Sequence, residues 1–101
     1  MKKLDIHFQL YINGEWKSGS DNQIMHSQNP HNNQTWASFD CANEKDIDLA
    51  VQSAKDALNN QSWKAMTASD RGKLLYKLAD LIENNADNIG NIESQDSGKL
   101  L

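Results

Sequence analysis

Cysteine and proline occur only once each in the 101 residues, and long apolar runs are missing. The lone Cys41 cannot form a disulfide within the chain. No segment approaches the ~20 consecutive apolar residues that a membrane-spanning helix needs. Gln9 and Asn13 interrupt the segment that follows the two lysines near the start, so a secretory signal is not credible. We therefore expect a soluble protein of the reducing cytoplasm, with no membrane partner.

Positive charge is also scarce. The chain carries 10 Lys and Arg against 14 Asp and Glu, which gives a formal net charge of −4. The charges are spread along the sequence, so it lacks the clustered basic surface that binds nucleic acid. The apolar fraction is 38%, below the usual share for a globular domain. These totals predict one domain at most, with a thin core and no nucleic-acid partner.

The first half of the chain has the pattern of strands. Asn13-Gly14 separates residues 10–12 from residues 15–17, and this pair is a strong hairpin signal because both turn positions need positive φ. Residues 24–28 and 35–41 form a second pair of extended runs. Between them lie Asn29-Pro30, where proline disfavours helix, and a polar turn. The turn ends near Asn33, and asparagine tolerates a left-handed backbone. The sequence predicts two hairpins over residues 10–41, and we expect residues 1–9 to be disordered.

The second half changes to helical periodicity. Asn43 with Asp46, and Thr67 with Asp70, have the spacing of capping boxes at helix starts. Each box precedes an amphipathic set of apolar residues, which are Ile47, Ala50, Val51, Ala54 and Leu58 in the first helix and Leu74, Leu75, Leu78, Leu81 and Ile82 in the second.

A third, shorter helix is predicted after a break at Asn84-Asn85. It covers about residues 86–94, and Gly98 ends the local structure. The fold class is therefore an α+β unit in which two β-hairpins precede two to three α-helices, the helices lying within residues 43–97.

The residues alone supply no catalytic group and no cofactor site. Cys41 lies just before the Asn43 cap, where a helix N-terminus can activate a thiol, but it is interpreted as a small buried apolar residue. The three histidines, His7, His26 and His31, are too scattered for metal-ligand spacing. Gly98-Lys99 is not a phosphate loop, because that motif needs a glycine five residues earlier and Ser or Thr after the lysine.

The order of several short segments resembles the opening of an aldehyde dehydrogenase. The matching segments span nearly the whole chain from residue 10, and each is weak alone, whereas their order and spacing together are specific. They are LYINGEW (10–16), NP (29–30), EKDIDLAV (44–51), Trp63, RGKLL (71–75), LADLI (78–82) and the acidic-x-Gly-Lys signature ESQDSGK (93–99). One local departure is Asn33, where similar sequences often have glycine.

This resemblance implies that residues 1–101 are the N-terminal portion of the cofactor-binding domain of a larger α/β enzyme. That enzyme would oxidise an aldehyde to a carboxylic acid with NAD or NADP as cofactor, and would be a homo-oligomer. Its catalytic cysteine, glutamate and asparagine and its nucleotide-binding turn would all lie beyond residue 101, so we expect this chain alone to be inactive. The alternative is a stand-alone, non-catalytic module that docks on a partner or homologue.

The resemblance also implies a site for a potassium or sodium ion. The family positions that hold such an ion correspond here to Ser27, Gln28 and Asp96. Alkali cations, like other hard cations, prefer oxygen ligands, and these residues offer a hydroxyl or carbonyl, a backbone carbonyl and a carboxylate. The alternative is that Asp96 only caps its helix or forms an ion pair near Lys99.

Overall fold

A three-stranded sheet forms one end of the molecule, and it includes a strand that the sequence pattern did not predict. The computed structural model describes residues 6–101. The strands are β1 (Ile6–Phe8), β4 (Ile24–Asn29) and β5 (Gln34–Asp40), in the order β1-β5-β4. Strand β1 is parallel to β5, with His7 opposite Ser38, and β4 is antiparallel to β5.

The expected disorder of residues 1–9 is therefore wrong for residues 6–8. The apolar residues Ile6 and Phe8 alternate with His7, but three residues are too few for a periodicity to register. The pairing that orders them is to β5, about thirty residues away in sequence, and a local pattern does not reveal it. Gln9, which links β1 to β2, is also placed, and its side chain donates to Ser18 Oγ at 3.3 Å. Residues 1–5 of that prediction lie outside the described residues.

Both predicted hairpins are confirmed. Strand β2 (Leu10–Ile12) pairs antiparallel with β3 (Glu15–Lys17). The turn between them has φ of 55° at Asn13 and 77° at Gly14, the left-handed values that the Asn-Gly pair accepts. In the β4–β5 hairpin, Asn33 has φ of 56° and supplies the left-handed turn residue.

Four helices follow the strands: α1 (Glu44–Leu58), α2 (Gln61–Lys64), α3 (Ala68–Asn84) and α4 (Ala86–Ser97). Both predicted capping boxes are formed, Asn43 with Asp46 on α1 and Thr67 with Asp70 on α3. The last helix runs three residues further than predicted and ends at Gly98, whose φ is 78°. The single-turn helix α2 was not predicted, because four residues carry no measurable periodicity.

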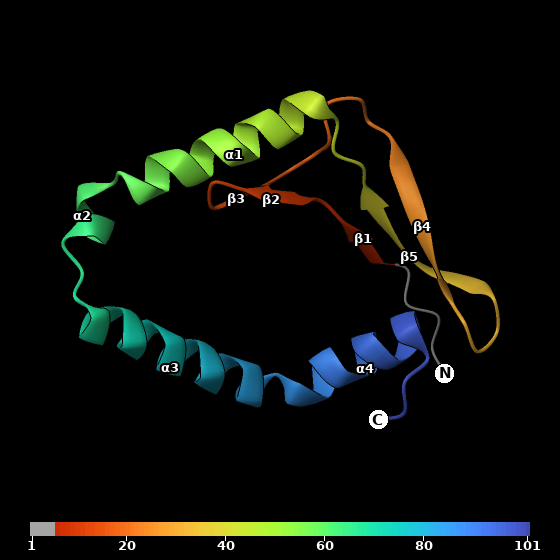
Figure 1. Ribbon diagram of the computed structural model, residues 1–101. Helices are drawn as coiled ribbons and strands as arrows, with labels where there is room; N and C mark the ends of the chain where they lie inside the picture. The colour runs from red at the N-terminus through yellow and green to blue at the C-terminus, as the bar shows by residue number, and fades with distance from the viewer. Residues whose placement is uncertain (1–5) are drawn as a thin grey trace.

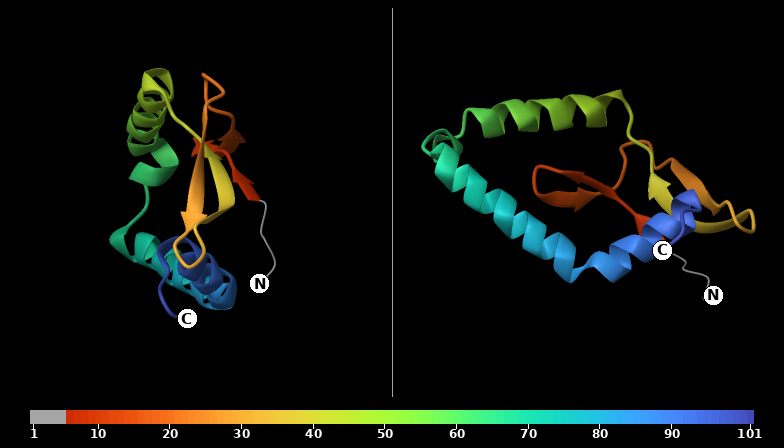
Figure 2. Two further views of the ribbon diagram at one scale, coloured as in Figure 1. Left: turned by 90° about the vertical axis from the view of Figure 1, so that its right-hand side faces the viewer. Right: turned by 60° about the horizontal axis from the view of Figure 1, so that its bottom comes forward.

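The elements form an open ring. Figure 1 shows α1, α2, α3 and α4 as an arc that leaves the sheet after β5 and returns to it at β4, with the β2–β3 hairpin lying inside the arc. The ring is flat, as the turned views in Figure 2 show, with extents of 49 × 35 × 16 Å. Its radius of gyration is 17.3 Å, against about 13 Å for a compact chain of this length.

Very little apolar surface is buried in this shape. Trp36 and Ala37 on β5 are the only buried apolar residues among those described. The core therefore lies on the central strand of the sheet, and the helices of the arc remain exposed.

Candidate functional site

The end of β4 with the following Pro30 (residues 27–30) meets the end of α4 with its C-cap Gly98 (residues 96–98) at one edge of the ring. The hydroxyl of Ser27 donates a hydrogen bond to Oδ1 of Asp96. The β4–β5 register shifts immediately after Ser27, which pairs with Ala37, while Gln28 pairs with Thr35. A bulge of this kind bends a strand locally and re-aims its side chains.

Glycine is required at position 98 for this contact. A Cβ built on Gly98 would lie 2.9 Å from Cγ of Pro30, closer than real Cβ atoms approach their neighbours, and its φ of 78° favours glycine. The Asn-Pro segment and the acidic-x-Gly-Lys signature, far apart in sequence, thus touch each other in the structure.

Two of the three predicted cation ligands are brought together, Ser27 and Asp96. Gln28, whose predicted contribution is its backbone carbonyl, directly follows Ser27 and is exposed. A hydroxyl and a carboxylate in contact are the hard oxygen donors that an alkali cation prefers, so these two residues fit such an ion. No group of three or more His, Cys, Asp and Glu side chains within residues 6–101 is arranged to hold a metal.

A cavity of about 520 Å³ lies beside this contact, between the sheet and α4. Its lining includes Ser27 and Asp96 together with the apolar side chains of Phe8, Trp36, Phe39 and Ile92. Phe8 and Trp36 pack edge to face with ring centroids 6.5 Å apart, an arrangement that aromatic quadrupoles favour.

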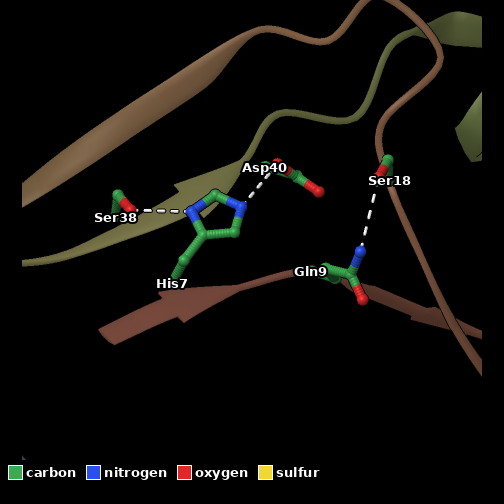
Figure 3. Close-up of polar contacts among 5 residues, drawn as sticks. All are labelled: His7, Gln9, Ser18, Ser38 and Asp40. Atoms are coloured by element: carbon green, nitrogen blue, oxygen red, sulfur yellow. Dashed lines mark hydrogen bonds and ion pairs between the residues drawn. The ribbon is translucent and has the colours of Figure 1, made fainter. Parts of the chain in front are cut away.

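A second polar cluster lies on the sheet and was missed by sequence reasoning. His7 on β1 bridges two residues of β5: its Nδ1 is 2.7 Å from Ser38 Oγ and its Nε2 is 2.9 Å from Asp40 Oδ1. Figure 3 shows the imidazole between these two side chains. Because a carboxylate only accepts, Nε2 donates to Asp40, and in the neutral imidazole Nδ1 accepts from Ser38. The cluster therefore fastens β1 to β5.

The same residue types occur in catalytic triads, but this cluster lacks what acyl transfer needs. Ser38 lies on the central strand and is paired on one side with His7 and on the other with His26. An oxyanion hole needs free N–H donors beside the nucleophile, whereas ladder pairing of β5 on both sides uses the neighbouring amides. We therefore read the cluster as structural.

The starts of α1, α3 and α4 are unfavourable for phosphate groups, because each carries an acidic side chain in its first turn. The carboxylates of Asp46 and Asp70 accept the backbone N–H of the N-cap residues Asn43 and Thr67, whose side chains accept the third amides of α1 and α3. Helix α4 carries Asp87 in its first turn. Helix N-termini bind anions only while those amides are free and the local charge is favourable. Lys99 instead pairs with Glu93, Nζ to Oε1, at 3.4 Å on the exposed surface.

Hydrogen bonds hold the pKa of both capping carboxylates below the usual 3.8. For Asp46 the main donor is the Ser20 hydroxyl, followed by the backbone N–H of Asn43 and of Ser20. For Asp70 the donors are the backbone N–H and side chain of Thr67. Both groups therefore stay ionised and continue to cap their helices at neutral pH.

Residues 16–101 match the sequence profile of the aldehyde dehydrogenase family. The chain is 43% identical, over 94 residues, to (Z)-2-((N-methylformamido)methylene)-5-hydroxybutyrolactone dehydrogenase of Acinetobacter baylyi, covering 93% of this chain and 19% of that protein. It is 41% identical to the mitochondrial 10-formyltetrahydrofolate dehydrogenase of Mus musculus over 94% of this chain and 10% of that protein. The chain thus spans a fifth or less of the length of these relatives.

Solved structures match in the same way. An aldehyde dehydrogenase from Bacillus cereus in complex with NAD+ superposes with a TM-score of 0.85 at 36% identity, over 89% of this chain and 18% of that one. An NAD-dependent aldehyde dehydrogenase from Sinorhizobium meliloti gives a TM-score of 0.90 at 23% identity over 96% of this chain and 20% of that one, a likeness of fold. The strands and helices described above therefore match the N-terminal region of much longer chains. Across residues 6–101 no helix is both long and apolar enough to cross a membrane.

Proposed function

Because the chain belongs to the aldehyde dehydrogenase family, we propose that it forms the N-terminal part of an NAD(P)-dependent enzyme that oxidises an aldehyde to a carboxylic acid. The observation that carries this proposal is the match over residues 16–101, in which strands, helices and the Gly98-Lys99 signature occur in the family's order. The whole enzyme would be a cytoplasmic homo-oligomer.

In this proposal the chain is a scaffold, and the reacting groups belong to other segments of the enzyme. The residues described here do not fit a dinucleotide, because the first turns of α1 and α3 carry the carboxylates of Asp46 and Asp70 and no glycine-rich turn cradles a phosphate. Cys41 is half-buried directly after β5 and is not assigned the nucleophile's role. The proposed contribution of the chain is therefore to shape and support the larger cofactor domain.

We also propose that Ser27, Gln28 and Asp96 hold a potassium or sodium ion in the whole enzyme. Support comes from the contact of the Ser27 hydroxyl with the Asp96 carboxylate and from the bulge that shifts the backbone at Gln28. The ion would link β4 to α4, and its remaining ligands would be backbone carbonyls or water.

A chimera tests the enzymatic part of the proposal. Residues 16–101 of this chain replace the corresponding segment of the Bacillus cereus aldehyde dehydrogenase, and NADH formation from an aldehyde is measured. We expect a rate of the same order as that of the parent, because the segment supplies support and not reacting groups. A soluble, oligomeric chimera that binds NAD+ but forms no NADH would contradict the proposal.

The alternative, a stand-alone module that docks on a homologue without any chemistry of its own, is favoured by one observation. The helices leave an unusual amount of apolar surface uncovered.

A further inference from the structure

The three-stranded sheet places two distant histidines in one row. His7 on β1 is the parallel partner of Ser38 on β5, and His26 on β4 is the antiparallel partner of the same Ser38. The side chains of directly paired residues share one face of a sheet. Asp40, two positions further along β5, lies on that face as well, because side chains alternate along a strand. The sequence spacing of the histidines argued against a metal site, and the sheet removes that objection for His7 and His26.

The face that carries this row is turned away from α4. The cavity between the sheet and α4 is lined by residues of the opposite alternation, Phe8, Ala37 and Phe39. The side chain of His7 is 42% exposed, and His26 is exposed as well. A hydrated ion can therefore reach both imidazoles without displacing a helix.

Asp40 has a carboxylate oxygen without a partner. Its side chain is only 10% exposed. Oδ1 accepts a hydrogen bond from His7 Nε2 at 2.9 Å, whereas Oδ2 is buried and has no hydrogen-bond partner among the described residues. A buried carboxylate oxygen that lacks both a donor and a cation is costly. A cation bound by this carboxylate removes that cost.

We propose that His7, His26 and Asp40 form a binding site for a divalent transition-metal ion, with zinc as the best match. Two imidazoles and a carboxylate, with water in the fourth position, are a ligand set that zinc accepts. Imidazole ligands favour zinc over magnesium and calcium, which prefer oxygen. The site is independent of the proposed function, because it shares no residue with the Ser27–Asp96 contact.

His7 and Asp40 already lie close to the positions of two zinc ligands. Nε2 of His7 and Oδ1 of Asp40 are 2.9 Å apart, and Figure 3 shows the imidazole directed at this carboxylate. Two ligand atoms of a tetrahedral zinc ion are about 3.3 Å apart when its bonds are 2.0–2.1 Å. A shift of less than about 0.5 Å therefore lets an ion replace the hydrogen bond.

His26 completes the set by turning its side chain. Within residues 6–101 no three such side chains converge as they stand. The backbones of His7 and His26 are two strand spacings apart, about 9–10 Å. Each histidine reaches about 6 Å from its Cα to a bound zinc ion, so the two together span this gap. An exposed side chain such as that of His26 changes rotamer within nanoseconds.

Ser38 can hold the His7 ring in the orientation that zinc needs. Zinc at Nε2 requires that Nε2 loses its proton to water and that Nδ1 takes one up, so the ring stays neutral. Ser38 Oγ lies 2.7 Å from Nδ1, and a hydroxyl accepts as well as donates. Ser38 thus changes from donor to acceptor and becomes the second hydrogen-bond partner that metal-bound histidines usually have.

Zinc chloride titrated into the untagged 101-residue chain tests the site. Calorimetry gives the stoichiometry and affinity, long-range ¹H–¹⁵N spectra of the imidazoles identify the bound nitrogens, and hydrogen exchange follows residues 6–8. We expect one zinc ion per chain with micromolar affinity, perturbed imidazole signals of His7 and His26, and slower exchange in residues 6–8, because the ion ties β1 to β4. Magnesium chloride should give no saturable heat.

Matched substitutions identify the ligands. His26→Ala and Asp40→Asn should each weaken zinc binding at least about tenfold, because loss of an outer partner of a metal ligand alone costs 10–100-fold. Asp40→Asn keeps the size of the side chain and an oxygen that accepts from His7. His31→Ala removes the histidine in the β4–β5 turn and should leave the affinity unchanged. Circular dichroism confirms that the three variants keep the same helix content.

Several results would overturn the proposal. They are the absence of saturable zinc binding, equal binding of magnesium, and an affinity that falls only with His31→Ala or with none of the substitutions, which would mean an adventitious ion only. Should a variant fail to fold, the spectra of the unsubstituted chain still decide. Zinc binding that leaves the imidazole signals of His7 and His26 unchanged would also overturn the site.

Discussion

The hydroxyl of Ser27 on β4 donates a hydrogen bond to the carboxylate of Asp96 on α4, across 69 positions of sequence. This contact, together with Pro30 against Gly98, closes the ring of helices onto the sheet. The two segments joined here contain Asn29-Pro30 and the acidic-x-Gly-Lys signature, both of which belong to the family resemblance. Their contact gives the signature residues a structural role, which is to close the ring.

The proposed cation should stabilise this closure. In the chimera, we expect potassium to raise the thermal midpoint, and Asp96→Ala to abolish that gain, because the substitution removes the only carboxylate ligand. Ser97→Ala, next to it on α4, is the control. An equal rise with potassium in the parent chimera and in Asp96→Ala would remove Asp96 from the site.

Two glycines should respond oppositely to alanine. Gly98→Ala forces a left-handed residue and a clash with Pro30, at a cost of at least about 1–2 kcal/mol. Gly72 lies within α3 with nothing within 4 Å of an added Cβ, so Gly72→Ala should gain about 0.5–1 kcal/mol. Thermal midpoints of the two variants of the 101-residue chain check this, and a fall for Gly72→Ala or no change for Gly98→Ala would be inconsistent with the structure.

Acid should weaken the α1 cap more than the α3 cap. Asp46 is 2% exposed and accepts from Ser20 as well as from Asn43, whereas the Asp70 carboxylate accepts only within its own box. The lowered pKa of Asp46 means that its stabilisation is full above the unfolded value near 3.8 and is lost as pH falls through the lower folded value.

The measurement is the helical circular dichroism of the 101-residue chain as a function of pH. We expect Asp46→Asn to lose more helix at neutral pH than Asp70→Asn, and to lose part of its remaining acid dependence below pH 4. Identical neutral-pH losses for the two variants would show that the bond to Ser20 contributes nothing.

The His7 cluster should control the pairing of β1 with β5. His7→Ala removes the bonds to Ser38 and Asp40, each contributing about 0.5–1.5 kcal/mol, so amide exchange in residues 6–8 should accelerate at least about fivefold. His26→Ala is the control, since His26 faces Ser38 from β4 and its side chain makes no hydrogen bond among the described residues. Equal exchange in the two variants would count against the bridge.

Local chemistry made most of the secondary structure predictable. The turn at Asn13-Gly14 and the capping boxes at Asn43 and Thr67 depend only on residues within four positions of each other. The sequence alone therefore specifies them. Strand β1 and the His7 bridge depend on a parallel pairing with β5 that no neighbouring residue signals. The paired Ser38 and Asp40, two residues apart on one strand face, become informative only after β1 is placed beside them.

The candidate site was predictable only through resemblance. Nothing local connects Ser27 with Asp96, and their contact depends on the arc of four helices returning to the sheet. The open shape of the ring could not be predicted from the sequence either. Amphipathic periodicity in α3 indicates which side of the helix is apolar, but it does not indicate what covers that side.

The central claim is that this chain supplies support for an aldehyde dehydrogenase and no reacting group. Its most direct test is an assay of the purified 101-residue chain with NAD+ and an aldehyde, in which NADH absorbance and the fluorescence of Trp16, Trp36 and Trp63 are followed together. We expect no NADH and no saturable fluorescence change, because the first turns of α1 and α3 carry carboxylates that repel a phosphate group. Aldehyde-dependent NADH formation, or saturable NAD+ binding in the micromolar range, would contradict the claim.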